Sequence, residues 1–75
     1  MRIEYDPRAD ALYIYLKEKA EVKESREVES GVTVDYDEKG NPVGIEILDV
    51  RKRLSPRDLS RIDLVNLGFF EGEAA

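Results

Sequence analysis

The sequence predicts an α+β fold, in which an antiparallel meander of about five strands precedes one short helix packed across the sheet. Two segments, residues 2–16 and 32–48, place β-branched and aromatic runs on either side of turn residues, as β-hairpins do. A charged segment at 22–28 has the composition of a weaker strand. From residue 54 onwards, the sequence carries the signals of a helix start.

The first hairpin joins Ile3–Tyr5 to Ala11–Leu16 through a loop that begins with Asp6. The Asp6 carboxylate can accept hydrogen bonds from the backbone two residues on, and the proline that follows fixes φ for a turn. Because side chains alternate along a strand, the second strand places leucine and isoleucine on one face, and Tyr13 and Tyr15 on the other. Such a strand is expected inside the sheet, or beneath a helix or a partner subunit.

The third strand, at 22–28, carries charge on both faces, which suits the edge of a sheet. Three glutamates in this part of the chain, Glu24, Glu27 and Glu29, are expected to be exposed. An open edge of this kind can also accept a strand from a partner protein.

The second hairpin joins Val32–Tyr36 to Val43–Leu48. In the turn between them, Gly40 is the natural occupant of a positive-φ position in a type I turn closed by a bulge. Pro42 lies where the fifth strand begins, and the missing N–H is tolerated at that position.

The helix is predicted to begin at Pro56, with Ser55 as its N-cap and Asp58 near the capping-box position. Leu54 and Leu59 flank this start as a hydrophobic staple requires. The local sequence therefore fixes where the helix begins.

The end of the helix has a weaker signal. Leu59 and Ile62 share a helical face, but apolar residues further on are scattered around the helix. We expect a helix over about 56–62, with extension to Leu67 as the alternative. Residues 71–75 are expected to form a frayed tail.

Composition limits the classes of function. The chain carries 17 acidic and 12 basic residues, a net charge of −5, and neither histidine nor cysteine. This balance argues against general nucleic-acid binding, which needs a cationic excess. No apolar run approaches the roughly 18 residues that span a bilayer, and the N-terminus lacks the apolar core of a signal peptide. We expect a cytoplasmic protein, and the abundance of charge without glutamine resembles thermophile proteins.

A chain of 75 residues is expected to form one domain over 1–75, with its sheet at about 2–50. Such a domain buries only roughly 60% of the surface that its unfolded chain exposes. Without a disulfide or an evident metal, its core rarely supplies more than about 3–5 kcal/mol. Association of subunits is the common remedy, so we predict a homodimer.

Three groups of charged residues are candidates for chemistry. Residues 35–46 match a calcium loop at its first, third, sixth and twelfth positions, but Lys39 stands where an oxygen ligand is needed. The basic residues of 51–61 are expected to form a solvated connection. Four carboxylates would suit acid–base or sugar chemistry if they gathered at one end of the sheet: Asp10, Asp35, Asp37 and Glu46. No spacing demands this, so no catalytic, cofactor-binding or metal-ligating residue is predicted.

Several segments together resemble the domain of unknown function 2283 family, which consists of small prokaryotic proteins. The resemblance covers roughly residues 2–50 and rests on Tyr5-Asp6, Asp10–Ile14, Asp35–Asp37, and Gly40 with Val43–Leu48. The family has no established activity, so the resemblance implies no catalytic residues. Some relatives are suggested to be antitoxin-like partners of small toxin proteins.

The function predicted from these observations is a non-enzymatic interaction module that self-associates and is antitoxin-like, with a small basic protein as its partner. Aromatic and acidic residues are the candidates for its interfaces: Tyr13, Tyr15, Glu24, Glu27 and Glu29. The alternative is a small enzyme or ligand-binding subunit whose clustered acidic residues bind a metal or a sugar.

Overall fold

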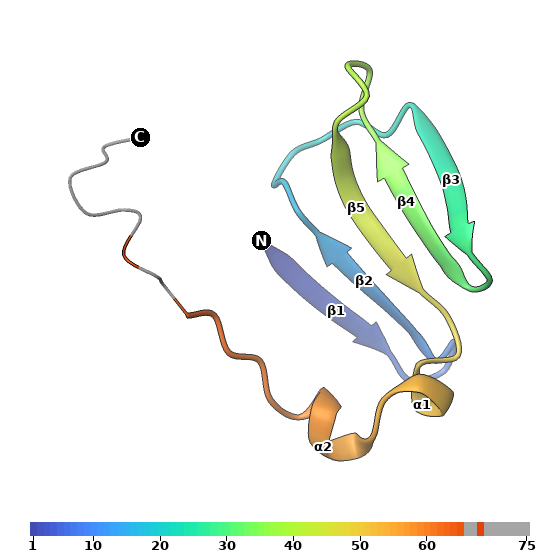
Figure 1. Ribbon diagram of the computed structural model, residues 1–75, viewed down its shortest axis with the longest axis vertical. Coiled ribbons are helices and arrows are strands. Elements are labelled where there is room, and N and C mark those ends of the chain that lie inside the picture. The colour runs from blue at the N-terminus through green and yellow to red at the C-terminus, as the bar shows by residue number, and fades with distance from the viewer. Residues whose placement is uncertain (66–67, 69–75) are drawn as a thin grey trace.

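The computed structural model describes residues 1–65 and residue 68, and shows a 5-stranded antiparallel sheet followed by two single-turn helices (Figure 1). The strands are β1 (Arg2–Asp6), β2 (Ala11–Tyr15), β3 (Glu24–Glu29), β4 (Val32–Tyr36) and β5 (Pro42–Ile47). The helices are α1 (Val50–Arg53) and α2 (Pro56–Leu59). The predicted α+β class and antiparallel sheet are confirmed.

The order of the strands is β1-β2-β5-β4-β3, which is meander-like with one departure from a simple meander. The departure is that β2 pairs with β5, so the chain between β2 and β3 crosses to the far edge of the sheet (Figure 1). The physical reason lies in the side chains. β2 has leucine and isoleucine on one face and tyrosines on the other. It therefore buries more apolar surface beside the apolar strand β5 than it would beside the charged strand β3. The charged strand takes the edge position predicted for it.

Alternation along the strands gives the sheet two chemically different faces. The apolar face consists of Ile3, Tyr5, Leu12, Ile14, Val32, Val34, Ile45 and Ile47, each opposite another of the set on an adjacent strand. The acidic face consists of Glu4, Asp6, Tyr13, Tyr15, Glu27, Thr33, Asp35 and Glu46.

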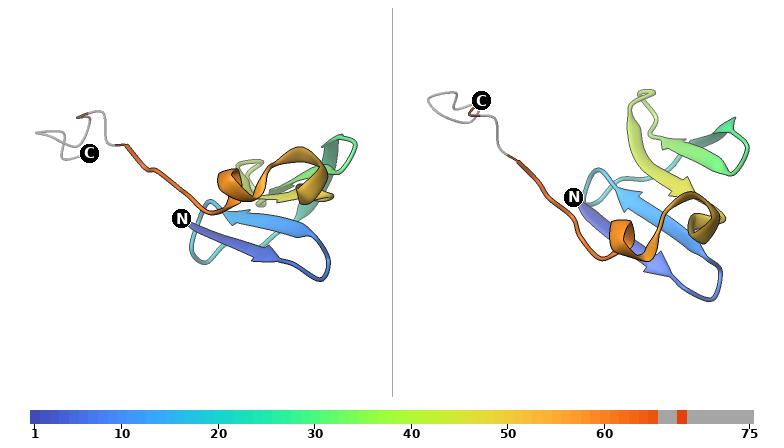
Figure 2. Two further views of the ribbon diagram at one scale, coloured as in Figure 1. Left: turned by 90° about the horizontal axis from the view of Figure 1, so that it is seen from below. Right: turned by 60° about the horizontal axis from the view of Figure 1, so that its bottom comes forward.

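Little of the described chain is fully buried. The buried hydrophobic residues are Val43, which is 4% exposed, and Val50, which is 0% exposed. Every residue of the apolar face is only half-buried. In the described chain, α1 and α2 lie on one side of the sheet at the end where β1 finishes, and most of that side has no second layer (Figure 2).

The basic residues at 51–53 lie in α1, where the sequence predicted a solvated connection, and α1 contacts two loops at the same end of the sheet. Arg51 donates its backbone N–H to the Asp10 carboxylate at 3.1 Å, and its guanidinium reaches the same group at 3.3 Å. Arg53 donates to the carbonyl oxygen of Ser30, in the turn between β3 and β4, at 2.6 Å. The two arginines thus hold the loop between β1 and β2 and the turn between β3 and β4.

In the turn between β4 and β5, the predicted positive φ of Gly40 is confirmed. Gly40 has a φ of 82°, and its N–H donates to the carbonyl oxygen of Asp37 at 3.0 Å. The Asp37 carboxylate accepts the N–H groups of Asn41 at 2.9 Å and Lys39 at 3.0 Å. The bond from Asn41 is the largest cause that lowers the pKa of Asp37. This carboxylate therefore serves to close a turn.

The start of α2 also matches the prediction. The Ser55 hydroxyl accepts the N–H of Asp58 at 3.1 Å, and the Asp58 carboxylate accepts the N–H of Ser55 at 3.0 Å. This reciprocal pair completes a capping box, and the bond from Ser55 lowers the pKa of Asp58.

The predicted extent of this helix was wrong. It ends at Leu59, so neither a helix to Ile62 nor its extension towards residue 67 is observed in residues 60–65. The apolar residues that follow fit no single helical face, and β-branched residues favour an extended chain. The predicted tail at 71–75 lies outside the described residues. Among the residues described, neither helix has the length or the apolar character needed to cross a bilayer.

Candidate functional site

The acidic face is a candidate site because its side chains form hydrogen bonds across several strands. Tyr13 of β2 donates its hydroxyl hydrogen to Asp35 of β4, and Ser25 of β3 donates to the same carboxylate at 2.6 Å. Tyr15 of β2 donates to Glu4 of β1 at 2.8 Å. The two tyrosine rings meet edge to face, with centroids 4.6 Å apart. This network connects β1 and β3 at the two edges of the sheet with the strands between them.

The central strand, β5, contributes to this network through a residue without a side chain, Gly44. Gly44 of β5 lies in register between Tyr15 and Asp35. The ring of Tyr13 lies over it, and a Cβ added at Gly44 would stand 2.6 Å from Cζ of that ring. The missing side chain is therefore what allows the Tyr13 hydroxyl to reach Asp35. An isolated glycine inside a strand was the sequence signal for this close approach.

In the network, the pKa of both tyrosines is raised and the pKa of Glu4 is lowered. Burial and then the hydrogen bond to Asp35 raise the pKa of Tyr13 to about 12. The bond between Tyr15 and Glu4 raises the pKa of the phenol and lowers the pKa of the carboxyl group. Both tyrosines therefore carry their protons at neutral pH, and the face keeps its negative charge.

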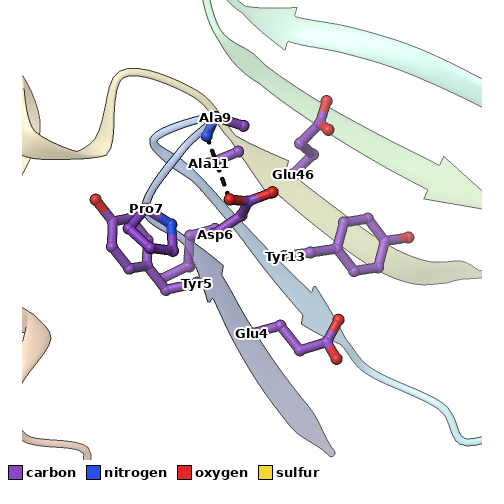
Figure 3. Close-up of a pocket in the computed structure, with 9 residues that line it drawn as sticks. Glu4, Tyr5, Asp6, Pro7, Ala9, Ala11, Tyr13 and Glu46 are labelled. Carbon is purple, nitrogen blue, oxygen red and sulfur yellow. Dashed lines mark hydrogen bonds between the residues drawn. The ribbon is translucent and has the colours of Figure 1, made fainter.

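A hollow of about 640 Å³ opens on the part of this face formed by β1, β2 and β5. Figure 3 shows Tyr13 standing between Glu4 of β1 and Glu46 of β5, with Asp6 on the same side. The small side chain of Ala11 contributes to its lining. A broad hollow with an aromatic wall and several carboxylates fits a cationic protein segment better than a small enclosed substrate.

The four carboxylates considered as a cluster do not gather at one end of the sheet. Asp10 lies beside α1, where it accepts the Tyr5 hydroxyl hydrogen at 2.8 Å. Asp37 lies in the turn between β4 and β5, at the opposite end of the sheet (Figure 1). Asp35 and Glu46 lie between these ends, on the acidic face. Within the described residues, no group of three or more His, Cys, Asp or Glu side chains could hold a metal ion.

The interface residues predicted from the sequence do not form one surface. They are Tyr13 and Tyr15 in β2, and Glu24, Glu27 and Glu29 in β3. Glu27 lies opposite Thr33 and so shares the acidic face with the tyrosines. Glu24 lies opposite Tyr36, on the other side of the sheet, and pairs with Arg26 at 2.7 Å. Of the three glutamates, Glu27 therefore contributes to the acidic face.

The family comparison covers this network. A family model described as Protein of unknown function (DUF2283) matches residues 2–51. The chain belongs to the DUF2283 family. The DUF2283 match includes all five strands, the Tyr13–Asp35 bond over Gly44, and the contact between Asp10 and Arg51. It ends before α2. No curated protein and no solved structure shows significant similarity to the chain.

Gly44→Ala should lower the free energy of unfolding by about 1–3 kcal/mol, because the new Cβ overlaps the Tyr13 ring. The same substitution should cost much less in a Tyr13→Ala background, where the overlapping ring is gone. Urea denaturation at a fixed protein concentration measures both costs. Equal costs in the two backgrounds would show that the ring does not constrain Gly44.

Tyr13 should ionise near pH 12, well above the ordinary tyrosine value of 10.0. A raised pKa in the folded state means that the stabilisation is complete below about pH 10 and is lost as the pH rises towards about 12. Ultraviolet absorbance titration should therefore show a late tyrosine step that Tyr13→Phe removes. Tyr36→Phe, on the other side of the sheet, is the matched control and should leave that step in place. A late step that survives Tyr13→Phe would contradict the assignment.

Proposed function

We propose that this DUF2283 protein is a non-enzymatic interaction module that self-associates as a homodimer through its apolar face. The proposal rests on the difference in burial between the residues of the apolar face and the buried hydrophobic residues. The eight residues named for the apolar face are only half-buried, whereas the buried hydrophobic residues of the described chain are Val43 and Val50.

The energetics favour covering this face. Complete burial of a valine, leucine or isoleucine side chain stabilises a protein by about 1.5–3 kcal/mol, so residues that are only partly buried leave some of this stabilisation unused. Two copies related by a two-fold axis present the same patch to each other, and such a closed pair does not grow further. The dimer would thus supply the second layer that a single sheet lacks.

The acidic face supports a second role, which is docking of a small basic protein in an antitoxin-like manner in the cytoplasm. When a second copy covers the apolar face, the acidic face remains on the outside of the dimer. Its carboxylates provide charge complementarity, and Tyr13 and Tyr15 provide aromatic contact area. Asp35 already accepts hydrogen bonds from the chain itself, which favours a binding role over an acid–base role.

Light scattering of the full chain at micromolar concentration should give about twice the chain mass of 8.6 kDa. Val34→Lys places a charge on the apolar face and should shift the mass towards that of the monomer. Thr33→Lys adds the same charge to the other face of the same strand and should leave the dimer intact. Circular dichroism checks that both variants fold. A monomer mass for the unsubstituted chain at all concentrations would overturn the proposal.

Basic proteins captured from a host extract by the immobilised chain should decrease as salt is raised, because the docking is electrostatic. The double variant Glu4→Lys/Glu46→Lys reverses charge at the hollow and should reduce this capture. The matched control is Glu18→Lys/Glu38→Lys, which makes the same change of charge in exposed connections. Quantitative mass spectrometry measures the yield. Equal yields from the two variants would contradict a role for the acidic face.

A further inference from the structure

We propose that the arm, residues 61–65, covers the apolar face of a second copy of the chain. This inference rests on the proposed self-association and names the segment that completes the interface. The arm follows α2 and projects beyond the β1 edge of the sheet (Figure 1).

The arm is strongly apolar and exposed. Ile62 is 68% exposed, Leu64 is 91% exposed and Val65 is 71% exposed. Several large apolar residues with this exposure within five positions are typical of a segment that binds to another surface. The sequence continues in the same character through Leu67, Phe69 and Phe70.

The apolar face offers a surface of matching chemistry where the arm begins. A hollow of about 330 Å³ lies between the sheet and the helical segment. Its apolar lining consists of Ile3, Tyr5 and Leu12 from the sheet, and Leu54, Leu59 and Ile62 from the segment that follows. Beyond this hollow, the half-buried residues of the central and distal strands continue the same apolar surface.

The direction of the chain favours a second copy over the chain's own sheet. After α2, the arm leads away from the sheet in both views (Figure 2). Folding back onto its own sheet would need a reversal within Arg61–Val65, which contains neither glycine nor proline, and Ile62 and Val65 favour an extended backbone. The first glycine beyond the arm is Gly68, which has a φ of 89°.

The arm is long enough to cover most of the apolar face of a second copy. Residues 61–65, fully extended, span about 17 Å. Strands in a sheet lie about 4.8 Å apart, so a sheet of this size is about 19 Å wide between its edge strands. An arm entering at one edge of a partner's sheet can therefore cover most of the apolar face. In a two-fold pair, both arms do so, and each chain gives and receives the same contact.

Cysteine cross-linking tests this placement cleanly, because the chain has no cysteine of its own. Isotope-labelled chains with Leu64→Cys are mixed with unlabelled chains that carry Ile45→Cys, and are treated with a short bis-maleimide. Ile45 lies on the apolar face of central β5, and Glu46→Cys is the matched control on the opposite face. We expect the Leu64–Ile45 cross-link between chains to exceed the Leu64–Glu46 cross-link at least about tenfold. A single chain that carries both Leu64→Cys and Ile45→Cys, and that cross-links only within itself, would overturn the inference.

A second measurement separates this inference from self-association. The variant Ile62→Ser/Leu64→Ser/Val65→Ser should raise the dimer dissociation constant at least about tenfold, because it removes the apolar contacts of the arm. Asp63→Ser, within the same segment, should change it by less than about twofold. If the unsubstituted chain is a monomer, the proposed function fails together with this inference. If it is a dimer whose dissociation constant the triple variant leaves unchanged, only the arm placement fails.

Discussion

A single sheet with one apolar face needs a second layer, and the described chain provides only two helical turns at one end of the sheet. Most features of the structure follow from this constraint. The buried hydrophobic residues are few, and the sheet is held by interactions other than a large core. Arg51 and Arg53 tie the β1–β2 loop and the β3–β4 turn to α1, while Tyr13 and Asp35 connect strands on the acidic face.

The residues matched to the DUF2283 family include several of those that form these connections. Asp10, Tyr13, Asp35 and Gly44 all lie in the segments that carry the resemblance, and each has a defined structural part. Asp10 receives Arg51, and Gly44 makes room for the ring that reaches Asp35. In this chain, the matched residues thus include contacts that hold a thin sheet together, and α2 and the arm lie outside the matched residues.

Features set by local sequence could be predicted. The two hairpins, the positive φ of Gly40 and the capping box at Ser55 each depend on a few neighbouring residues. Features set by distant contacts could not. The choice of β5 as neighbour of β2 depends on comparing all strands, and α1 is fixed by contacts 41 residues away in sequence, from Arg51 to Asp10.

In the candidate site, too, features set by local sequence could be predicted and features set by distant contacts could not. Alternation correctly separated the two tyrosines from the apolar residues of β2, because it needs only the period of a strand. The hydrogen bond from Tyr13 of β2 to Asp35 of β4 passes over β5. It therefore depends on the register of β2 with β5 and on the register of β4 with β5, and the sequence specifies neither. The register also has a functional consequence, because a slip of one residue would exchange the two faces of a strand. Tyr13 can reach Asp35 only when the glycine of β5 lies between them. The network on the acidic face therefore fixes which residues form the apolar face, and couples the integrity of one face of the sheet to that of the other.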